Sequence, residues 1–120
     1  MADHNDFGTQ GEQMAKSYLV KKGYKILKTN YRVRNAEVDI IAELGGIVVF
    51  VEVKSRKNAR FGLPEMFVSM EKRRNMKKVA RFYIEAHKVQ GPSRFDIISI
   101  IMSGEGVDEI KHFEDAFFLT

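Results

Sequence analysis

Residues 37–54 read EVDIIAELGGIVVFVEVK, two apolar runs separated only by Gly45-Gly46. A Gly-Gly pair between such runs is typical of a β-hairpin with a tight turn, because glycine adopts the positive φ angles that the turn requires. With the glycines as a two-residue loop, Leu44 lies opposite Ile47, and the pairing continues outward from there. A four-residue loop centred on the glycines keeps this register, whereas a β-bulge would shift it.

The register sorts the hairpin side chains onto two faces, since successive residues of a strand point to opposite sides of the sheet. It places Asp39 directly opposite Glu52, and Glu37 opposite Lys54, with all four side chains on one face. The other face is apolar and is predicted to lie in the core; it consists of Val38, Ile40, Ala42, Val49, Val51 and Val53.

Asp39 and Glu52 pose a physical problem, because like charges directly opposed across two strands, with Cβ atoms roughly 4.5–5.5 Å apart, destabilise a sheet. A divalent cation held between the two carboxylates would remove that penalty. Oxygen ligands without cysteine or histidine favour Mg²⁺ or Mn²⁺ over zinc, and Lys54 would project beside the ion on the same face. The alternative is an ordinary polar strand face that meets water.

The rest of the chain alternates helical and extended patterns. A helix is predicted from Gln10 to Lys22, with Thr9 as its N-cap and Gly23 as its end. A second helix is predicted from Ser69, as N-cap, to about His87; its buried side would consist of Met76, Val79, Ala80, Tyr83 and His87. Besides the hairpin, extended segments are predicted near 24–31, 94–102 and 107–113. This order predicts an α/β domain with one mixed sheet and a helix on each side.

The composition is that of one globular domain over residues 1–120, of which residues 1–8 are expected to be loose. Hydrophobic residues make up 44% and charged residues 30%, which is unlike a disordered or membrane protein, and no apolar run approaches the ~20 residues of a membrane span. The absence of cysteine excludes disulfides, thiolate chemistry and zinc ribbons. Because the acidic, polar N-terminus is unlike a signal peptide, we expect a cytoplasmic protein with no membrane partner.

Positive charge is concentrated in one part of the chain. The stretch from Lys54 to Lys88 holds eleven basic and three acidic residues, whereas the remainder holds nine basic and thirteen acidic ones. A basic stripe on an otherwise acidic body favours a polyanionic partner such as nucleic acid. The alternative is a solvated, charged helix surface.

Asp39, the hairpin and the sequence Glu52-Val53-Lys54 together resemble the PD-(D/E)xK nuclease superfamily, which has a restriction-endonuclease-like core. More narrowly, the chain resembles the YraN family of small bacterial endonuclease-like proteins, which are similar to Holliday-junction resolvases. The matching segments are Gly11-Glu12, Ala15, Tyr18-Leu19, Gly23-Tyr24, Asn30-Tyr31-Arg32, 37–42, 51–56, Phe61-Gly62, Pro64-Glu65, Lys72 and Arg94-Phe95-Asp96. One departure is Ala36, where the family often has glycine.

The resemblance implies a restriction-endonuclease-like mixed central sheet flanked by helices, with a metal site on it. Asp39 and Glu52 would be the metal-binding carboxylates, and the Val53 carbonyl a further ligand. Lys54 would orient or activate the attacking water and stabilise charge on the phosphate. Glu12 corresponds to the acidic residue that completes such sites in resolvase-like relatives; without the resemblance, it would be assigned to favouring its own helix N-terminus.

Two other charged residues have structural interpretations. Glu37 is predicted to form a cross-strand ion pair that positions Lys54. Asp96 is predicted to be structural and to pair with a buried arginine.

The leading functional hypothesis is a nuclease dependent on Mg²⁺ or Mn²⁺ that cleaves DNA, or alternatively RNA, in a structure-selective or nonspecific manner. The predicted nucleic-acid-binding residues are Arg56, Lys57 and Arg60 after the motif, and Lys72, Arg73, Arg74 and Lys77 on the second helix. By analogy with resolvases, a homodimer is expected. The alternatives are a non-catalytic nucleic-acid-binding module that retains the nuclease fold, and an adaptor whose basic helix binds an acidic protein.

Overall fold

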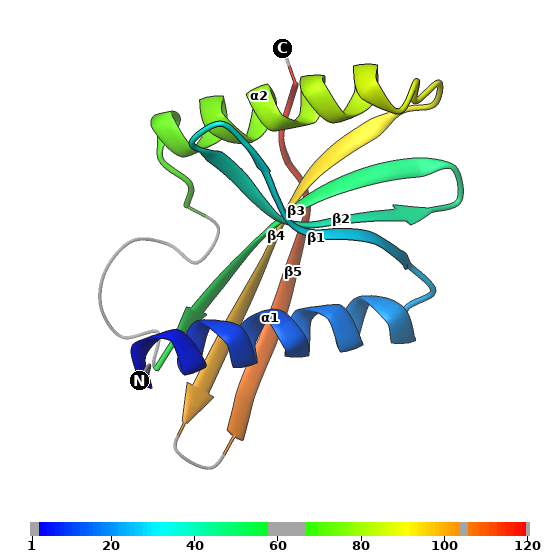
Figure 1. The fold of residues 1–120 in the computed structure, drawn as a ribbon. Coiled ribbons are helices and arrows are strands. Elements are labelled where there is room, and N and C mark those ends of the chain that lie inside the picture. The colour runs from blue at the N-terminus through cyan, green and yellow to red at the C-terminus, as the bar shows by residue number, and fades with distance from the viewer. Residues whose placement is uncertain (1–2, 58–66, 104–105, 120) are drawn as a thin grey trace.

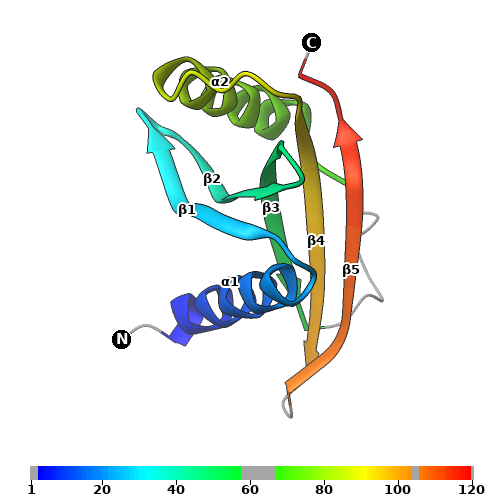
Figure 2. The same ribbon diagram turned by 90° about the vertical axis from the view of Figure 1, so that its right-hand side faces the viewer.

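The computed structural model describes residues 3–57, 67–103 and 106–119. Two helices and five strands follow one another in the order α1 (Asp3–Lys21), β1 (Lys25–Val33), β2 (Ala36–Leu44), β3 (Ile47–Arg56), α2 (Met70–Ala86), β4 (Ser93–Ser103) and β5 (Gly106–Phe117). The strands form one sheet in the order β1-β2-β3-β4-β5 (Figures 1 and 2). The β3–β4 pair is parallel and the other pairs are antiparallel, so the sheet is mixed.

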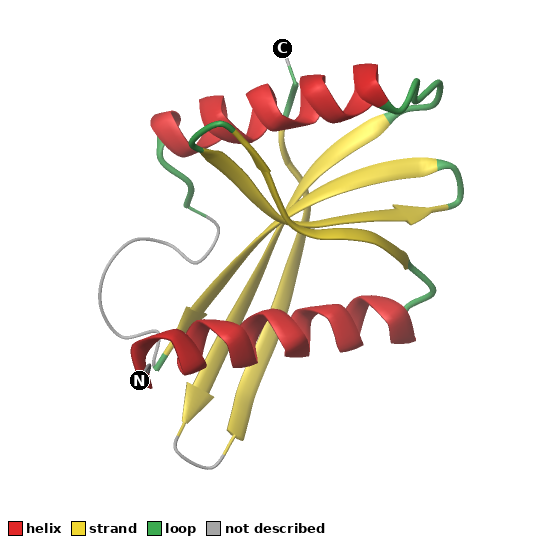
Figure 3. Ribbon diagram, in the orientation of Figure 1, coloured by secondary structure: helices red, strands yellow, loops and turns green. Residues whose placement is uncertain are grey.

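The helices cover opposite faces of the sheet, as Figure 3 shows. On the α1 side, Ala15 and Leu19 are fully buried against a strand surface formed by Ile40, Ala42, Val49, Val51, Ile98, Ile100 and Met102. On the α2 side, Met76, Val79 and Ala80 are buried against Val38, Ile41, Phe50, Phe95 and Ile97. The predicted α/β class, with a mixed central sheet flanked by helices, is therefore confirmed. Among the residues that the structure describes, no helix is long and apolar enough to cross a membrane.

The register of the β2–β3 hairpin is confirmed from Leu44↔Ile47 to Ile40↔Val51, and both turn glycines have positive φ. The predicted faces fail at one residue, Val38, which packs on the α2 side rather than with Ile40 on the α1 side. The regular β2–β3 ladder stops at Ile40, and the strict alternation of side chains across the faces is lost at Asp39. Figure 1 shows the β1–β2 ribbon diverging from β3.

The helix boundaries correct two predictions. Helix α1 begins at Asp3 rather than at Gln10, so Thr9 lies inside the helix and is not its N-cap. Helix α2 does begin after Ser69, whose side-chain oxygen accepts a hydrogen bond from the Lys72 N–H at 3.1 Å. His87 at its C-cap is exposed and stacks on Tyr83, so the predicted buried side of α2 ends one turn earlier.

Helix α1 approaches β3 closely at Gly11. A Cβ atom at this position would collide with the Ser55 hydroxyl and lie 3.0 Å from the Ser55 Cβ. Glycine is therefore required for the close contact between helix and strand, and not for an unusual φ angle.

We expect Gly11→Ala to lower the free energy of unfolding by about 1–3 kcal/mol, since overpacking a tight contact costs this much. Urea unfolding followed by circular dichroism would measure the loss. Gly8→Ala is the matched control, because an added Cβ there meets nothing within 4 Å. Removing the hydroxyl with Ser55→Ala should restore part of the loss in the double variant, and full additivity of the two changes would contradict the steric explanation.

A buried polar cluster ties β5 to β4 on the α1 side. Asp96 is completely buried and accepts hydrogen bonds from Arg94 Nε and Nη2 (both 2.9 Å), from the Asp115 N–H (2.9 Å) and from His112 Nε2 (2.7 Å). Arg94 Nη2 also donates to the Tyr24 hydroxyl at 2.7 Å. The predicted pairing of Asp96 with an arginine is confirmed, and the Arg94 side chain is partly buried, at 15% exposed.

Candidate metal and phosphodiester site

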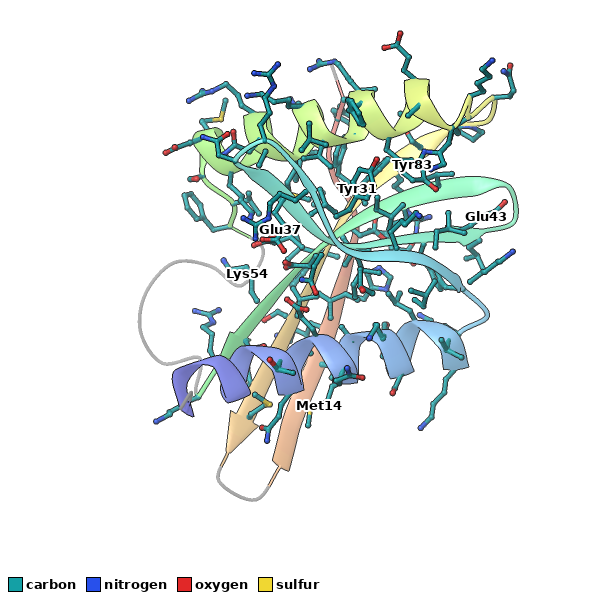
Figure 4. All side chains as sticks on the ribbon, viewed as in Figure 1. Met14, Tyr31, Glu37, Glu43, Lys54 and Tyr83 are labelled. Atoms are coloured by element: carbon teal, nitrogen blue, oxygen red, sulfur yellow. The ribbon has the colours of Figure 1, made fainter. Side chains whose placement is uncertain are left out.

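The candidate site lies where β2 leaves β3. One residue beyond the last regular pair, Asp39 Oδ2 accepts a hydrogen bond from the Val53 N–H at 2.8 Å. The carboxylate thus binds the β3 backbone at the point where the ladder itself ends, which fixes Asp39 beside Glu52. Figure 4 shows Glu37 and Lys54 in this region, whereas Glu43 lies toward the opposite end of β2.

Asp39 and Glu52 form a pair of partly buried carboxyl groups whose pKa values are both raised. Burial raises the pKa of Asp39 to about 7, and the charge of Glu52 adds to this rise. Burial also raises the pKa of Glu52, and the charge of Lys72 and hydrogen bonding with Asp39 oppose this rise. The pair therefore tends to retain a proton near neutral pH. The sequence predicts that two negative charges at these positions are unfavourable, and the raised pKa values agree with that prediction.

A lysine from α2 supplies a positive charge to this pair. Lys72 Nζ lies 3.3 Å from Glu52 Oε1, and its charge lowers the pKa of both Glu52 and Asp39. The contact has an ion-pair distance but not the angle of a hydrogen bond, so Glu52 Oε1 is a buried oxygen without a hydrogen-bond donor. This lysine was predicted to bind nucleic acid, and its contact with Glu52 was missed.

Lys54 lies on β3, two residues after Glu52, and reaches toward the start of α2. Its Nζ donates a hydrogen bond to the Phe67 carbonyl at 2.6 Å and lies 5.9 Å from the centre of the Phe67 ring. Burial lowers the pKa of Lys54, and the charge of Arg56 lowers it further, while the charge of Glu52 opposes both effects. Lys54 is thus close enough to Glu52 to interact with it, and a backbone carbonyl holds its position.

Glu37 does not position Lys54, which corrects the predicted cross-strand ion pair. Glu37 Oε1 instead pairs with Arg32 Nη2 on β1 at 3.2 Å. The prediction required the hairpin register to continue to Glu37. The ladder ends at Ile40, so the outer part of β2 follows β1 and not β3.

Glu12 faces the same region from α1 but is bound by a different group. The Asn30 side-chain amide donates to both Glu12 carboxylate oxygens, at 3.1 and 3.3 Å. The charge of Glu12 contributes to the raised pKa of Asp39. Glu12 lies well inside the helix, so stabilisation of the helix N-terminus does not explain it. In the described part of the chain, no three His, Asp or Glu side chains gather into one potential metal-binding group.

The predicted nucleic-acid-binding residues occupy several environments. Arg73 donates to the Val68 carbonyl at 3.1 Å, and both Arg73 and Lys77 lie over the Phe117 ring. Lys57 and Arg74 are exposed, and Arg56 is partly buried. Arg60 lies outside the described residues, as do the matched segments Phe61-Gly62 and Pro64-Glu65. Four cations of α2, Arg74, Lys77, Lys78 and Arg81, line a hollow of about 480 Å³ together with Leu119.

The donors at this site suit a hard divalent cation. Two carboxylates lie together beside the Val53 backbone, and Glu52 Oε1 has no hydrogen-bond donor. Carboxylate and carbonyl oxygens are the ligands that Mg²⁺ and Mn²⁺ prefer, and such an ion would stabilise the ionised forms of both carboxyl groups, which burial disfavours. The residues present therefore fit the cation that the sequence predicts.

The raised pKa of Asp39 has a consequence for stability. Because the folded protein retains this proton up to about pH 7 and the unfolded chain loses it near pH 3.8, the free energy of unfolding falls as the pH rises between these values. We expect Asp39→Asn to be nearly neutral at pH 4 and to stabilise the metal-free protein by about 1–3 kcal/mol at pH 8. The amide oxygen can still accept the Val53 hydrogen bond.

Urea unfolding in a chelator at several pH values would measure this difference, and Glu43→Gln at the far end of β2 serves as a control. If the difference in the free energy of unfolding between Asp39→Asn and the natural protein does not change with pH, the raised pKa of Asp39 is contradicted.

Comparisons with known proteins match the chain over nearly its full length. A family model described as "Uncharacterised protein family UPF0102" matches residues 11–100. A UPF0102 protein from Christiangramia forsetii is 43% identical over 118 residues, covering 98% of each chain. One from Thermodesulfovibrio yellowstonii is 43% identical over 113 residues, covering 94% of this chain and 96% of the relative.

Among solved structures, one titled as Pyrococcus furiosus SfsA in complex with Ca²⁺ aligns with 93% of this chain at a TM-score of 0.42 and 20% identity. The alignment covers 64% of that protein, somewhat less than two thirds, and so weak a likeness carries no argument about the site. The family model and the relatives, by contrast, span the described core and the carboxylate pair. The chain therefore belongs to the UPF0102 family, the YraN family that its motifs resemble.

Proposed function

We propose that this protein is a nuclease that uses Mg²⁺ or Mn²⁺ to hydrolyse phosphodiester bonds in DNA. The observation that supports the proposal best is the partly buried pair Asp39 and Glu52, raised in pKa and flanked by Lys54 and Lys72. A pair of acids in such an unfavourable position suggests a functional rather than a structural role.

Asp39, Glu52 and the Val53 carbonyl would hold the cation, and Glu12 would add negative potential from α1. When bound, the cation would neutralise charge on the phosphate and increase the acidity of the attacking water. The water oxygen forms a bond to phosphorus as the bond to the leaving oxygen breaks. The water gives up one proton and the leaving oxygen takes up one, so the net reaction consumes one water molecule.

Lys54 would stabilise the negative charge that develops on the phosphate oxygens. An ammonium group has three donors, so its hydrogen bond to the Phe67 carbonyl leaves donors for the phosphate while holding the group in place. The lowered pKa of Lys54 also makes it a better proton donor than a free lysine.

The phosphate backbone would be bound by exposed cations that follow β3 or lie on α2. Lys57 follows β3, and Arg74, Lys78 and Arg81 line the hollow on α2. Contacts of this kind give binding that depends on salt and not on base sequence, so we propose structure-selective or nonspecific cleavage. We also propose that the protein acts as a homodimer, by analogy with resolvases.

The test is cleavage of end-labelled linear, flap and four-way-junction DNA, and of a single-stranded RNA, in Mg²⁺, Mn²⁺ or a chelator. We expect cutting that requires the cation and that falls roughly 100-fold in Lys54→Ala, the size of loss typical when one group that stabilises transition-state charge is removed. Because Lys54→Ala is purified in the same way as the natural protein, its loss of cutting would also show that a contaminating nuclease is not responsible. Junction binding without cutting under any condition would overturn the proposal in favour of a non-catalytic nucleic-acid-binding module.

A further inference from the structure

The carboxylate pair has a resident cation of its own. Lys72 Nζ lies 3.3 Å from Glu52 Oε1, and the side chains of this ion pair are 35% and 16% exposed. We propose that Lys72 is the exchangeable counter-ion of this pair, which a divalent cation displaces when it binds. The inference rests on the proposed function, since it concerns the same metal site.

Lys72 and a bound cation would compete for the same oxygen. A divalent ion needs direct contact with the carboxylate oxygens, at roughly 2.0–2.6 Å, and Glu52 Oε1 is the oxygen that Lys72 approaches. An ammonium this close to the ion would be strongly repelled, because two positive charges would share one partly buried site. Binding of the cation thus requires Lys72 to move away.

The contacts of Lys72 allow its side chain to move while its backbone stays fixed. The Lys72 N–H donates to the Ser69 hydroxyl at 3.1 Å, which anchors the residue in the first turn of α2. By contrast, its ammonium lacks hydrogen-bond geometry toward Glu52 Oε1, and the side chain is 35% exposed. A flexible four-carbon stem permits the charge to reach solvent without any change in the helix.

Lys54 is a useful comparison on the other side of the pair. Its ammonium is held at 2.6 Å by the Phe67 carbonyl, and no ion pair joins it to Asp39 or Glu52. Of the two lysines, Lys72 is therefore the one that occupies the carboxylates. Once displaced, its charge would remain beside the site at the start of α2, where a phosphate group would arrive.

The experiment measures Mn²⁺ binding by calorimetry in the complete chain at pH 8. Lys72→Met should bind Mn²⁺ roughly tenfold more tightly than the natural protein, because the competing charge of a partly buried ion pair is gone. Lys72→Arg keeps that charge and should stay within about threefold of the natural affinity. Lys78→Met, an exposed lysine on the same helix with the same change in net charge, is the matched control and should have little effect.

A second measurement uses the natural protein and does not depend on a variant folding. Amine-reactive labelling followed by mass spectrometry would report the exposure of Lys72, and we expect Mg²⁺ to increase its labelling rate about threefold or more while Lys78 stays unchanged.

The outcomes separate this inference from the proposed nuclease. Tighter Mn²⁺ binding in Lys72→Met supports the exchange even if the natural protein cuts no substrate. Equal or weaker binding in a folded Lys72→Met overturns the exchange and leaves a metal-dependent nuclease standing. Failure of every form to bind Mn²⁺, or labelling of Lys72 that does not respond to Mg²⁺, also overturns the exchange.

Discussion

Glu52→Gln is expected to weaken Mn²⁺ binding and to reduce cation-dependent cleavage sharply while leaving the protein folded. The amide is a poorer ligand for a hard cation than the carboxylate, and the site loses one of its two adjacent negative charges. We expect cleavage to fall by at least about 100-fold, and by more if the cation no longer binds. Calorimetry with Mn²⁺ and cleavage of the substrate that the natural protein prefers would measure the two effects together.

Stability should change little in Glu52→Gln, for a specific reason. The change removes the repulsion between Glu52 and Asp39, but it also leaves Lys72 without its ion-pair partner, and the two effects oppose each other. Glu43→Gln, which removes one charge at the far end of β2, is the matched control and should keep both binding and cleavage (Figure 4). Cleavage that persists in Glu52→Gln would place the chemistry elsewhere.

The sequence predicts the centre of the site because local rules determine it. The Gly45-Gly46 turn fixes the register of the inner hairpin, and from that register Asp39 and Glu52 are predicted to lie together. Burial raises the pKa of both carboxyl groups, which agrees with the predicted cost of placing two negative charges close together. The buried side of α2 was predicted in the same way, from apolar residues at helical spacing.

The outer part of the hairpin could not be predicted from the same rule. Asn30, opposite this part of β2, has a positive φ of 49°, and its side chain turns toward Glu12 on α1. The β2–β3 ladder therefore ends near a left-handed residue and a contact with a helix, and the hairpin pattern contains neither. Val38 and Glu37 were misplaced for this reason.

Lys72 was missed as a member of the site because its contact depends on the connection between β3 and β4. These strands are parallel, so the chain must cross back over the sheet, and α2 returns along one face. Lys72 looks like any other residue of a basic helix surface in the sequence. A signal that could have found it is the Ser69 N-cap, which places Lys72 in the first turn of α2, at the end where the chain arrives from β3.

Asp96→Ala should be the most destabilising of these substitutions, with an expected loss of about 3–5 kcal/mol in the free energy of unfolding at pH 7. Four hydrogen bonds end on this buried carboxylate, and its removal leaves the partly buried Arg94 guanidinium with only Glu114, at 3.8 Å, as an ion-pair partner. It also frees the Asp115 N–H, which holds an irregular stretch of β5 against β4. Urea unfolding would measure the loss, with Glu109→Gln, in an exposed ion pair, expected to cost less than about 1 kcal/mol.

The pH dependence identifies the charge of Asp96 as the cause. His112, Arg94 and the Asp115 N–H together hold the pKa of Asp96 below its usual 3.8, against the opposing effect of burial. A lowered pKa means that the carboxylate stabilises the fold above pH 3.8 and that this contribution is lost as the pH falls below it. Asp96→Asn keeps the shape of the side chain, so the stability difference between it and the natural protein should be largest at pH 7 and should shrink below pH 4. A difference that stays constant down to pH 3 would show that packing, and not the ion pair, makes Asp96 necessary.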